Sequence, residues 1–149
     1  MKLSLAIAAD HRGLALKEKL IPFLQKKGIR VLDYGTDSEE SCDYPDFILK
    51  AAEAVQKKKT DRALGICYTG IGSAIAANKV KGVRAALVQN LIQAKLSRSH
   101  NDSNMLILGA GFVSSAQAQR IVEAWLRTEF EGGRHARRLS KIARYEKRN

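Results

Sequence analysis

Cysteine, proline and tryptophan are scarce in this sequence, and no apolar stretch is long enough to span a bilayer. The only two cysteines, Cys42 and Cys67, do not make a disulfide framework, which indicates a reducing, cytoplasmic setting. Met1-Lys2 leads directly into a strand-like run, so we expect no signal peptide. The composition, 45% apolar and 28% charged, is typical of one soluble globular domain over residues 1–149.

Acidic residues are too few to balance the basic ones, and the net charge is +11. Seven basic residues lie between Arg134 and Arg148, against Glu146 alone. Such a helix is typically a solvated face or, less often, a patch for anions or nucleic acid. The few aromatic residues are not interleaved with it, so we expect no nucleic-acid partner and no membrane partner. A non-catalytic domain that binds anions or nucleic acid is the alternative from another class.

Apolar runs of strand length alternate with stretches of helical periodicity. Strands are expected at 3–9, 29–32, 63–66, 83–88 and 105–108, and helices at 14–27, 45–59, 73–79, 91–99, 114–127 and 134–146. The run 3–9 does not alternate, which predicts a strand buried on both faces. The pattern indicates an α/β fold: a three-layer α/β/α, Rossmann-like open sheet of about five parallel strands with right-handed crossovers, followed by a basic C-terminal helix. Pro22 interrupts the first helix and can kink it.

Residues 66–74 combine a thiol, a hydroxyl, two glycines and the start of a helix. A strand, a glycine turn and a helix in that order form an anion site, because the first helical N–H groups point out of the sheet edge. Gly70 and Gly72 let a bound anion approach the backbone closely. A thiolate at Cys67 beside such donors suits proton abstraction from a carbon next to a carbonyl. A buried structural cysteine before an ordinary turn is an equally open reading.

The same stretch excludes two nucleotide-binding motifs. No Gly-Lys-Ser/Thr follows, as a Walker loop requires. The dinucleotide fingerprint needs a small residue where Ile75 stands, and an acidic residue after the next strand, which reads Ala-Ala-Leu-Val-Gln over 85–89.

Ligands of open parallel sheets bind outside the carboxyl ends of the strands. This rule selects Asp10-His11, residues 67–73 and the segment after residue 108. His100 and Asn101 lead into the last strand from the opposite end, so they reach the site only if another subunit or a fold-back brings them there.

Seven short motifs follow one another along nearly the whole chain. They are Ala9-Asp10-His11, Asp33-Tyr34-Gly35-Thr36, Asp43-Tyr44-Pro45, Cys67-Tyr68-Thr69-Gly70-Ile71-Gly72, Ala76-Ala77-Asn78-Lys79, Ser97-Arg98-Ser99-His100-Asn101-Asp102 and Glu131-Gly132-Gly133-Arg134-His135. Together they resemble the ribose-5-phosphate isomerase type B family, which includes galactose- and allose-6-phosphate isomerases.

The resemblance implies an aldose–ketose isomerase, an intramolecular oxidoreductase that uses no metal and no other cofactor. Its implied reaction is the interconversion of ribose 5-phosphate and ribulose 5-phosphate in the pentose phosphate pathway, through a cis-enediolate. A six-carbon or four-carbon sugar phosphate is the alternative substrate. The family also implies a homodimer, or a dimer of dimers, with each active site at the interface.

Roles follow from the motifs of that resemblance. Cys67 is the base that moves a proton between C1 and C2, and His100 and Thr69 open the sugar ring. Substrate binding falls to Asp10 and Asn101 for hydroxyls, to Gly70, Ile71, Gly72 and Ser73 for the enediolate oxygen, and to His11, Arg134 and Arg138 for the phosphate. Guanidinium groups four residues apart on one helix face suit a phosphate.

Some of these residues have simpler readings. Asp10 can cap the helix that follows it, and His100 can be a turn residue. His135 is expected to be a structural or rim residue, and Cys42, in a polar loop, is expected to have no role.

The sequence departs from the family pattern at two positions. Tyr68 stands where the family usually has a glycine after the cysteine, and Gly111 stands where it usually has an arginine. Arg137 is adjacent to Arg138, so a helix turns the two about 100° apart and Arg137 does not simply replace the missing cation. Weaker phosphate binding or a bulkier substrate is therefore expected.

Overall fold

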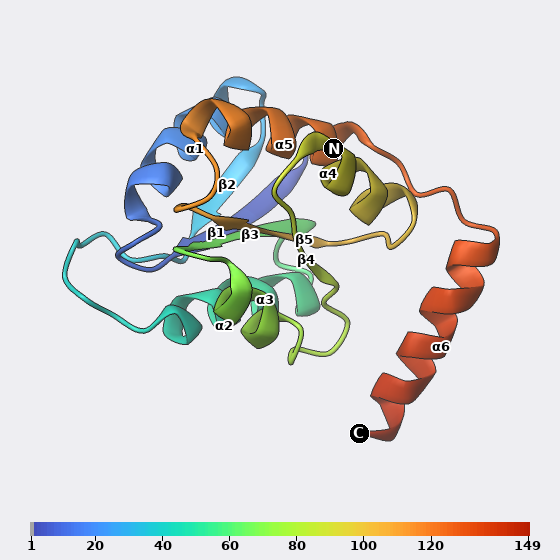
Figure 1. Cartoon of the computed structure of the whole chain (residues 1–149). Helices are drawn as coiled ribbons and strands as arrows, with labels where there is room; N and C mark the ends of the chain where they lie inside the picture. The colour runs from blue at the N-terminus through green and yellow to red at the C-terminus, as the bar shows by residue number, and fades with distance from the viewer. Residues whose placement is uncertain (1) are drawn as a thin grey trace.

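The computed structural model describes residues 2–149 as five strands and six helices in an α/β arrangement (Figure 1). The elements in chain order are β1 (Ser4–Ala9), α1 (Leu14–Lys26), β2 (Arg30–Asp33), α2 (Tyr44–Gln56), β3 (Arg62–Cys67), α3 (Ile71–Ala77), β4 (Ala85–Leu87), α4 (Leu91–Ser99), β5 (Met105–Gly109), α5 (Ser115–Arg127) and α6 (Arg134–Arg148). No helix within residues 2–149 has both the length and the apolar character needed to cross a membrane.

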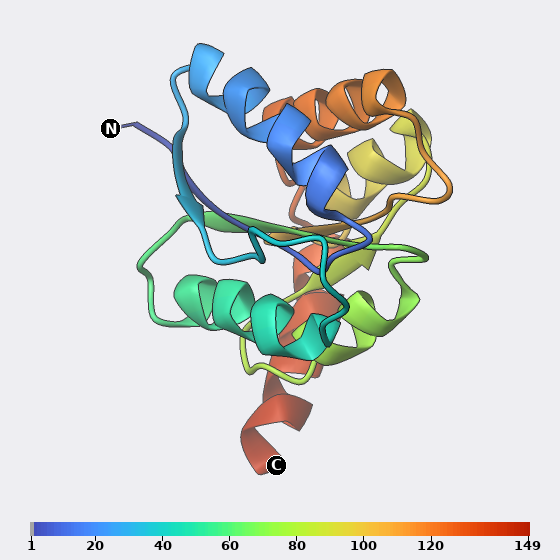
Figure 2. The same ribbon diagram turned by 90° about the vertical axis from the view of Figure 1, so that its left-hand side faces the viewer.

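All five strands are parallel, in the order β2-β1-β3-β5-β4. Connections that step one way along the sheet place α1 and α4 on one face, and connections that step the other way place α2 and α3 on the opposite face (Figures 1 and 2). A single crossover hand requires this division. The predicted fold class, a three-layer open parallel sheet, is confirmed.

The core consists of two apolar layers on either side of the sheet. Alternate residues of β1 face opposite layers: Leu5, Ile7 and Ala9 pack under α1, α4 and α5, whereas Ala6 and Ala8 pack under α2 and α3. The α2 side is built from small residues, and a Cβ atom at Gly65 would lie 2.8 Å from Ile107 and 2.9 Å from Ile48. Gly65 therefore lets α2 approach β3 closely.

The chain direction across the sheet reverses between β1 and β3. The connection after β1 leads to β2 at one edge of the sheet, and the connection after β3 leads to β4 at the other edge. The chain therefore leaves the carboxyl ends of these two neighbouring strands in opposite directions. The Asp10 N–H donates to the Ile66 carbonyl at 3.3 Å and holds the two ends together. Open α/β sheets bind ligands at such a switch point.

Three local features concern the predicted helix and strand boundaries: the length of β4, the effect of Pro22 on α1 and the start of α5. β4 covers only three residues, and directly before it Asn104 Oδ1 accepts the Arg84 N–H at 2.7 Å in place of a main-chain carbonyl. α1 runs unbroken through Pro22, whose exposed position leaves the freed Glu18 carbonyl to water. Ser114, where the predicted helix begins, caps α5 in a capping box with Gln117.

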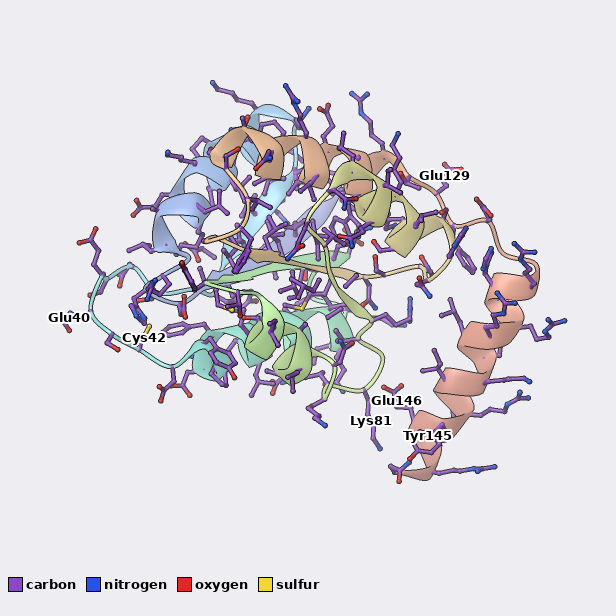
Figure 3. All side chains as sticks on the ribbon, in the orientation of Figure 1. Glu40, Cys42, Lys81, Glu129, Tyr145 and Glu146 are labelled. Carbon is purple, nitrogen blue, oxygen red and sulfur yellow. The ribbon has the colours of Figure 1, made fainter. Side chains whose placement is uncertain are left out.

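The last helix, α6, projects away from the three-layer body (Figures 1 and 2). Figure 3 shows its end near the loop that contains Lys81, where the Gly82 N–H donates to Glu146 Oε1 at 2.9 Å. Ile142 and Tyr145 on this helix are exposed.

Lys17 is a buried cation whose partners set a stability prediction. Its Nζ donates to both carboxylate oxygens of Asp33, at 3.0 and 2.8 Å, and to the Thr36 carbonyl. Asp33→Ala should reduce the free energy of unfolding by about 2–3 kcal/mol, less than for a fully buried pair because the Asp33 side chain is 41% exposed. Lys17→Met, which removes the charge and keeps the volume, should cost less than about 1.5 kcal/mol. Urea unfolding of both variants measures the difference, and equal losses would contradict this account.

Candidate active site

The carboxyl ends of β1 and β3 bring one group of predicted residues together. Cys67 is the last residue of β3 and only 4% exposed, and its Sγ accepts the Gly70 N–H at 3.2 Å. Gly70 adopts a left-handed conformation with φ of 80°, which turns the chain from the strand into α3. The thiol therefore lies against the turn that opens the helix.

Two of the four predicted anion-binding N–H groups are already engaged. The Gly70 N–H bonds to Cys67, and the Ile71 N–H donates to Thr69 Oγ1 at 3.1 Å. The N–H groups of Gly72 and Ser73 have no partner within residues 2–149. They are the donors left for an oxyanion at this turn.

Tyr44 belongs to this turn, although the sequence singled it out only as part of a motif. A Cβ atom at Gly72 would lie 2.4 Å from Cζ and 2.5 Å from the hydroxyl of Tyr44. The Tyr44 ring therefore packs directly on the backbone of the first turn of α3. The glycine at 72 was the available signal, but its partner lies in a different helix.

Asp10 has two roles open to it, one for each carboxylate oxygen. Its Oδ1 accepts the N–H groups of Arg12 and Gly13, each at 3.0 Å. The carboxylate therefore stabilises the turn that leads into α1, but it does not cap that helix, whose N-cap is Gly13 without a side-chain cap bond. Its Oδ2 accepts nothing from the part of the chain described here, so it can accept a ligand hydroxyl.

His11 is oriented by the backbone of Cys42. The Cys42 N–H donates to His11 Nδ1 at 3.2 Å, so Nδ1 is an acceptor and Nε2 carries the proton of the neutral ring. Figure 3 shows Cys42 on the loop before α2, far from α6. Cys42, for which no role was expected, thus positions a donor through its main chain.

A second group of predicted residues lies at the opposite end of the strands. His100 caps the end of α4, and its ring stacks on His135 with centroids 4.1 Å apart and planes 12° apart. Burial lowers the pKa of His135, and nearby His100 and Arg134 lower it further, while Glu131 acts in the opposite direction. His135 is therefore neutral at neutral pH and is a buried structural neighbour of His100 rather than a rim residue.

The loop that carries His100 and Asn101 is held rigidly by buried polar contacts. Arg98 donates to Asp102 Oδ1 at 2.8 Å and to the Ser103 carbonyl at 2.6 Å. Trp125 Nε1 donates to Ser103 Oγ at 2.8 Å. These contacts fix the loop without using the imidazole of His100.

His100, Glu131 and His135 place three potential metal ligands within 4.8 Å of one another. A metal ion bound by two imidazoles lies in the plane of both rings. Stacked, nearly parallel rings cannot both point a lone pair at one ion. The cluster as it stands does not fit a metal ion held by both rings.

One chain does not unite the two groups. β5 has five residues, so about 16 Å of strand separates its amino end, near His100, from its carboxyl end, near Cys67. Arg134 and Arg138 lie on α6 beside the His100 group, whereas His11 lies beside Cys67. The predicted phosphate ligands are divided in the same way as the predicted catalytic residues.

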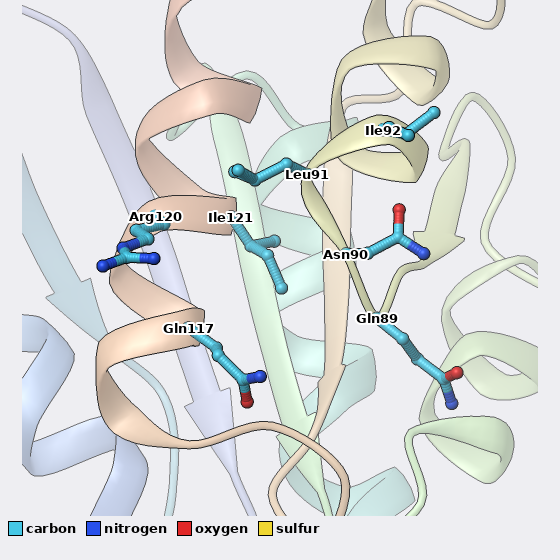
Figure 4. A pocket seen from close by; sticks show the side chains of 7 residues that line it. All are labelled: Gln89, Asn90, Leu91, Ile92, Gln117, Arg120 and Ile121. Atoms are coloured by element: carbon cyan, nitrogen blue, oxygen red, sulfur yellow. The ribbon is translucent and has the colours of Figure 1, made fainter.

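A separate hollow of ≈ 400 Å³ lies between α4 and α5 (Figure 4). Gln89, Leu91 and Ile121 are among its lining residues, and none of the predicted site residues is. It is not where the predicted chemistry converges.

Comparison with known proteins identifies the family of the chain. The sequence profile described as ribose/galactose isomerase matches residues 5–142. Ribose-5-phosphate isomerase B of Escherichia coli (strain K12) is 42% identical over 144 residues, covering 97% of each chain. The structure of Clostridium thermocellum ribose-5-phosphate isomerase B matches with a TM-score of 0.96 and 50% identity, over 98% of this chain and 99% of that one.

A structure of ribose-5-phosphate isomerase B from Mycoplasma genitalium with bound ribulose-5-phosphate also matches. Its TM-score is 0.96 and its identity 44%, over 100% of this chain and 99% of that one. These matches span nearly the full length of both partners. The chain belongs to the ribose/galactose isomerase family.

Proposed function

We propose that this protein is an aldose–ketose isomerase that interconverts ribose 5-phosphate and ribulose 5-phosphate. The observation that carries the proposal is the thiol of Cys67 on the turn whose Gly72 and Ser73 N–H groups have no partner among residues 2–149. A base and an oxyanion-binding turn at one point are what proton transfer beside a carbonyl requires. The relatives named ribose-5-phosphate isomerase B support the choice of substrate.

The chemical step uses one base twice. The Cys67 thiolate takes the proton from C2 of the open-chain aldose, and the C1 carbonyl oxygen becomes the enediolate oxygen. The N–H groups of Gly72 and Ser73 stabilise that charge. The C2 hydroxyl proton passes to the C1 oxygen, and the thiol returns its proton to C1, which leaves a hydroxyl-bearing CH2 group at C1 and a ketone at C2. No electrons leave the substrate, and no cofactor is needed.

Ring opening must precede this step, and we assign it to His100 with Thr69. Since these residues lie at opposite ends of the strands in one chain, the site we propose is composite. One protomer supplies Asp10, His11, Cys67 and Thr69, and its partner supplies His100, Asn101, Arg134 and Arg138. The division of the phosphate ligands supports the same arrangement.

Exposed apolar side chains support association of two copies. Ile71 and Ile75 on α3 are 56% and 59% exposed, and Ile92 on α4 is 71% exposed. A groove of ≈ 440 Å³ lies between α6 and the body, lined by residues that include Leu139 and Ile142. Exposed apolar surface is typical of a homodimer contact. Part of it lies on α6, the helix that also carries Arg134 and Arg138.

We also propose that the protein is cytoplasmic and that it acts in the pentose phosphate pathway. Both thiols, Cys42 and Cys67, are free. A reducing compartment keeps a catalytic thiol available.

The substrate is the first point to test, because the family description names both ribose and galactose. Pentose, tetrose and hexose phosphates can be incubated with the protein in deuterated water and followed by NMR. We expect deuterium at C1 or C2 fastest with ribose 5-phosphate. Faster exchange with a six-carbon or four-carbon phosphate would assign that substrate instead. Salt-dependent binding without any exchange would identify a non-catalytic anion binder.

Cys67→Ala should reduce turnover by at least about a hundredfold and leave inhibitor affinity nearly unchanged, because a base acts on proton transfer and not on ground-state binding. Cys42→Ala is the matched control, since it removes the other thiol and keeps the backbone N–H that orients His11. Steady-state kinetics and calorimetry with a phosphate-bearing inhibitor measure both effects. Turnover within a few-fold of wild type would remove Cys67 from the mechanism.

Composite sites predict complementation between two inactive chains. A heterodimer of Cys67→Ala and His100→Asn contains one site with both residues intact. A random mixture should therefore recover about a quarter of the wild-type activity, whereas each homodimer alone stays inactive. Native mass spectrometry verifies subunit exchange. Verified heterodimers without activity would mean that each site is built within one chain.

A further inference from the structure

The two positions at which the sequence departs from the family pattern are in contact with each other. The Tyr68 ring lies against Gly111, where an added Cβ atom would be 2.5 Å from the ring. Phe112 packs at 6.1 Å from the same ring, between centroids. Any side chain at 111 would displace Tyr68, so the tyrosine requires the glycine.

Arg12 lies over the Tyr68 ring, with its guanidinium carbon 4.2 Å from the ring centroid. Arg12 belongs to the turn after β1 and Tyr68 to the turn after β3, so the pair spans the switch point of the sheet. The main-chain N–H of Arg12 donates to Asp10, and His11 is the residue before Arg12. The guanidinium itself has no ion pair and no hydrogen bond within residues 2–149.

A guanidinium that stacks on an aromatic face keeps its N–H edge free. Cation–π stacking uses the flat face of the group, whereas phosphate recognition uses the coplanar N–H fork. Tyr68 thus fixes the position of Arg12 without occupying its donors. His11, the residue before Arg12 on the same turn, offers a second donor through its Nε2.

We propose that Arg12 binds the phosphate of the sugar substrate and that Tyr68 is its positioning residue. This inference rests on the proposed function and adds a phosphate ligand to it. It replaces the expectation that Gly111 leaves the phosphate short of one cation. The cation comes from the turn after β1 instead of the segment after β5, and Gly111 provides the space for the ring that holds it.

The first test separates binding from turnover. Arg12→Gln keeps much of the side-chain length and loses the charge, so the KM for ribose 5-phosphate should rise by about tenfold or more. The kcat should fall far less, because the contact is present in both ground and transition states. Arg12→Lys should recover part of the loss. Arg127→Gln removes an equal charge from an exposed position on α5 that is not part of the proposed site, and it is the control.

The second test addresses Tyr68. Tyr68→Leu removes the aromatic face and should raise the KM by a few-fold, whereas Tyr68→Phe keeps the ring and should raise it less. Gly111→Ala should act in the same direction as Tyr68→Leu, because the added Cβ atom displaces the ring. Equal effects of Tyr68→Leu and Tyr68→Phe would show that the ring does not position Arg12.

Calorimetry with inorganic phosphate distinguishes this inference from the proposed function. Weaker phosphate binding in Arg12→Gln than in Arg127→Gln supports the ligand role, even if wild type does not turn over ribose 5-phosphate. Normal turnover by wild type with an unchanged KM and unchanged phosphate affinity in Arg12→Gln overturns the role of Arg12 alone. The absence of phosphate binding to wild type would overturn it as well.

Discussion

The close contact between the ends of β1 and β3 is the constraint on which the candidate site depends. The turn after β1 lies directly on β3, and a Cβ atom at Gly13 would be 2.6 Å from the Ile66 carbonyl oxygen. Glycine at 13 allows this approach, and the Asp10 N–H bond to Ile66 holds it. This approach brings the turn that contains Asp10 and His11 beside Cys67. It therefore assembles the part of the proposed site that one protomer supplies.

The order and type of the elements could be predicted because they depend on local patterns. Unbroken apolar runs mark buried parallel strands, and Ser114 marks a helix start, so both were found. The edge of the sheet that carries Cys67 follows from the parallel topology alone. The start of β4 could not be predicted, since the side chain of Asn104, a residue distant in sequence, accepts the Arg84 N–H in place of a main-chain carbonyl. Tyr44 on Gly72 and Arg12 on Tyr68 were missed for the same reason: their partners are distant in sequence.

The separation of the two residue groups has a simple cause. A parallel strand carries one turn at its carboxyl end and the preceding loop at its amino end, so Cys67 and His100 are kept apart by the length of the sheet. A second copy is the most economical way to unite them, because a two-fold axis repeats every contact in both directions. In the composite site that we propose, the projecting α6 contributes both exposed apolar residues to association and arginines to phosphate binding.

Arg12, Tyr68 and Gly111 are linked by contacts with the Tyr68 ring, so the effects of substitutions at these three positions depend on one another. Residues in contact do not contribute additively. An arginine at 111 would collide with the Tyr68 ring, and a glycine at 68 would leave Arg12 without its stacking partner. Each change by itself removes something that the other two residues need. On the role that we propose for Arg12, a phosphate-binding cation on the turn after β1 requires compatible residues at positions 12, 68 and 111 together.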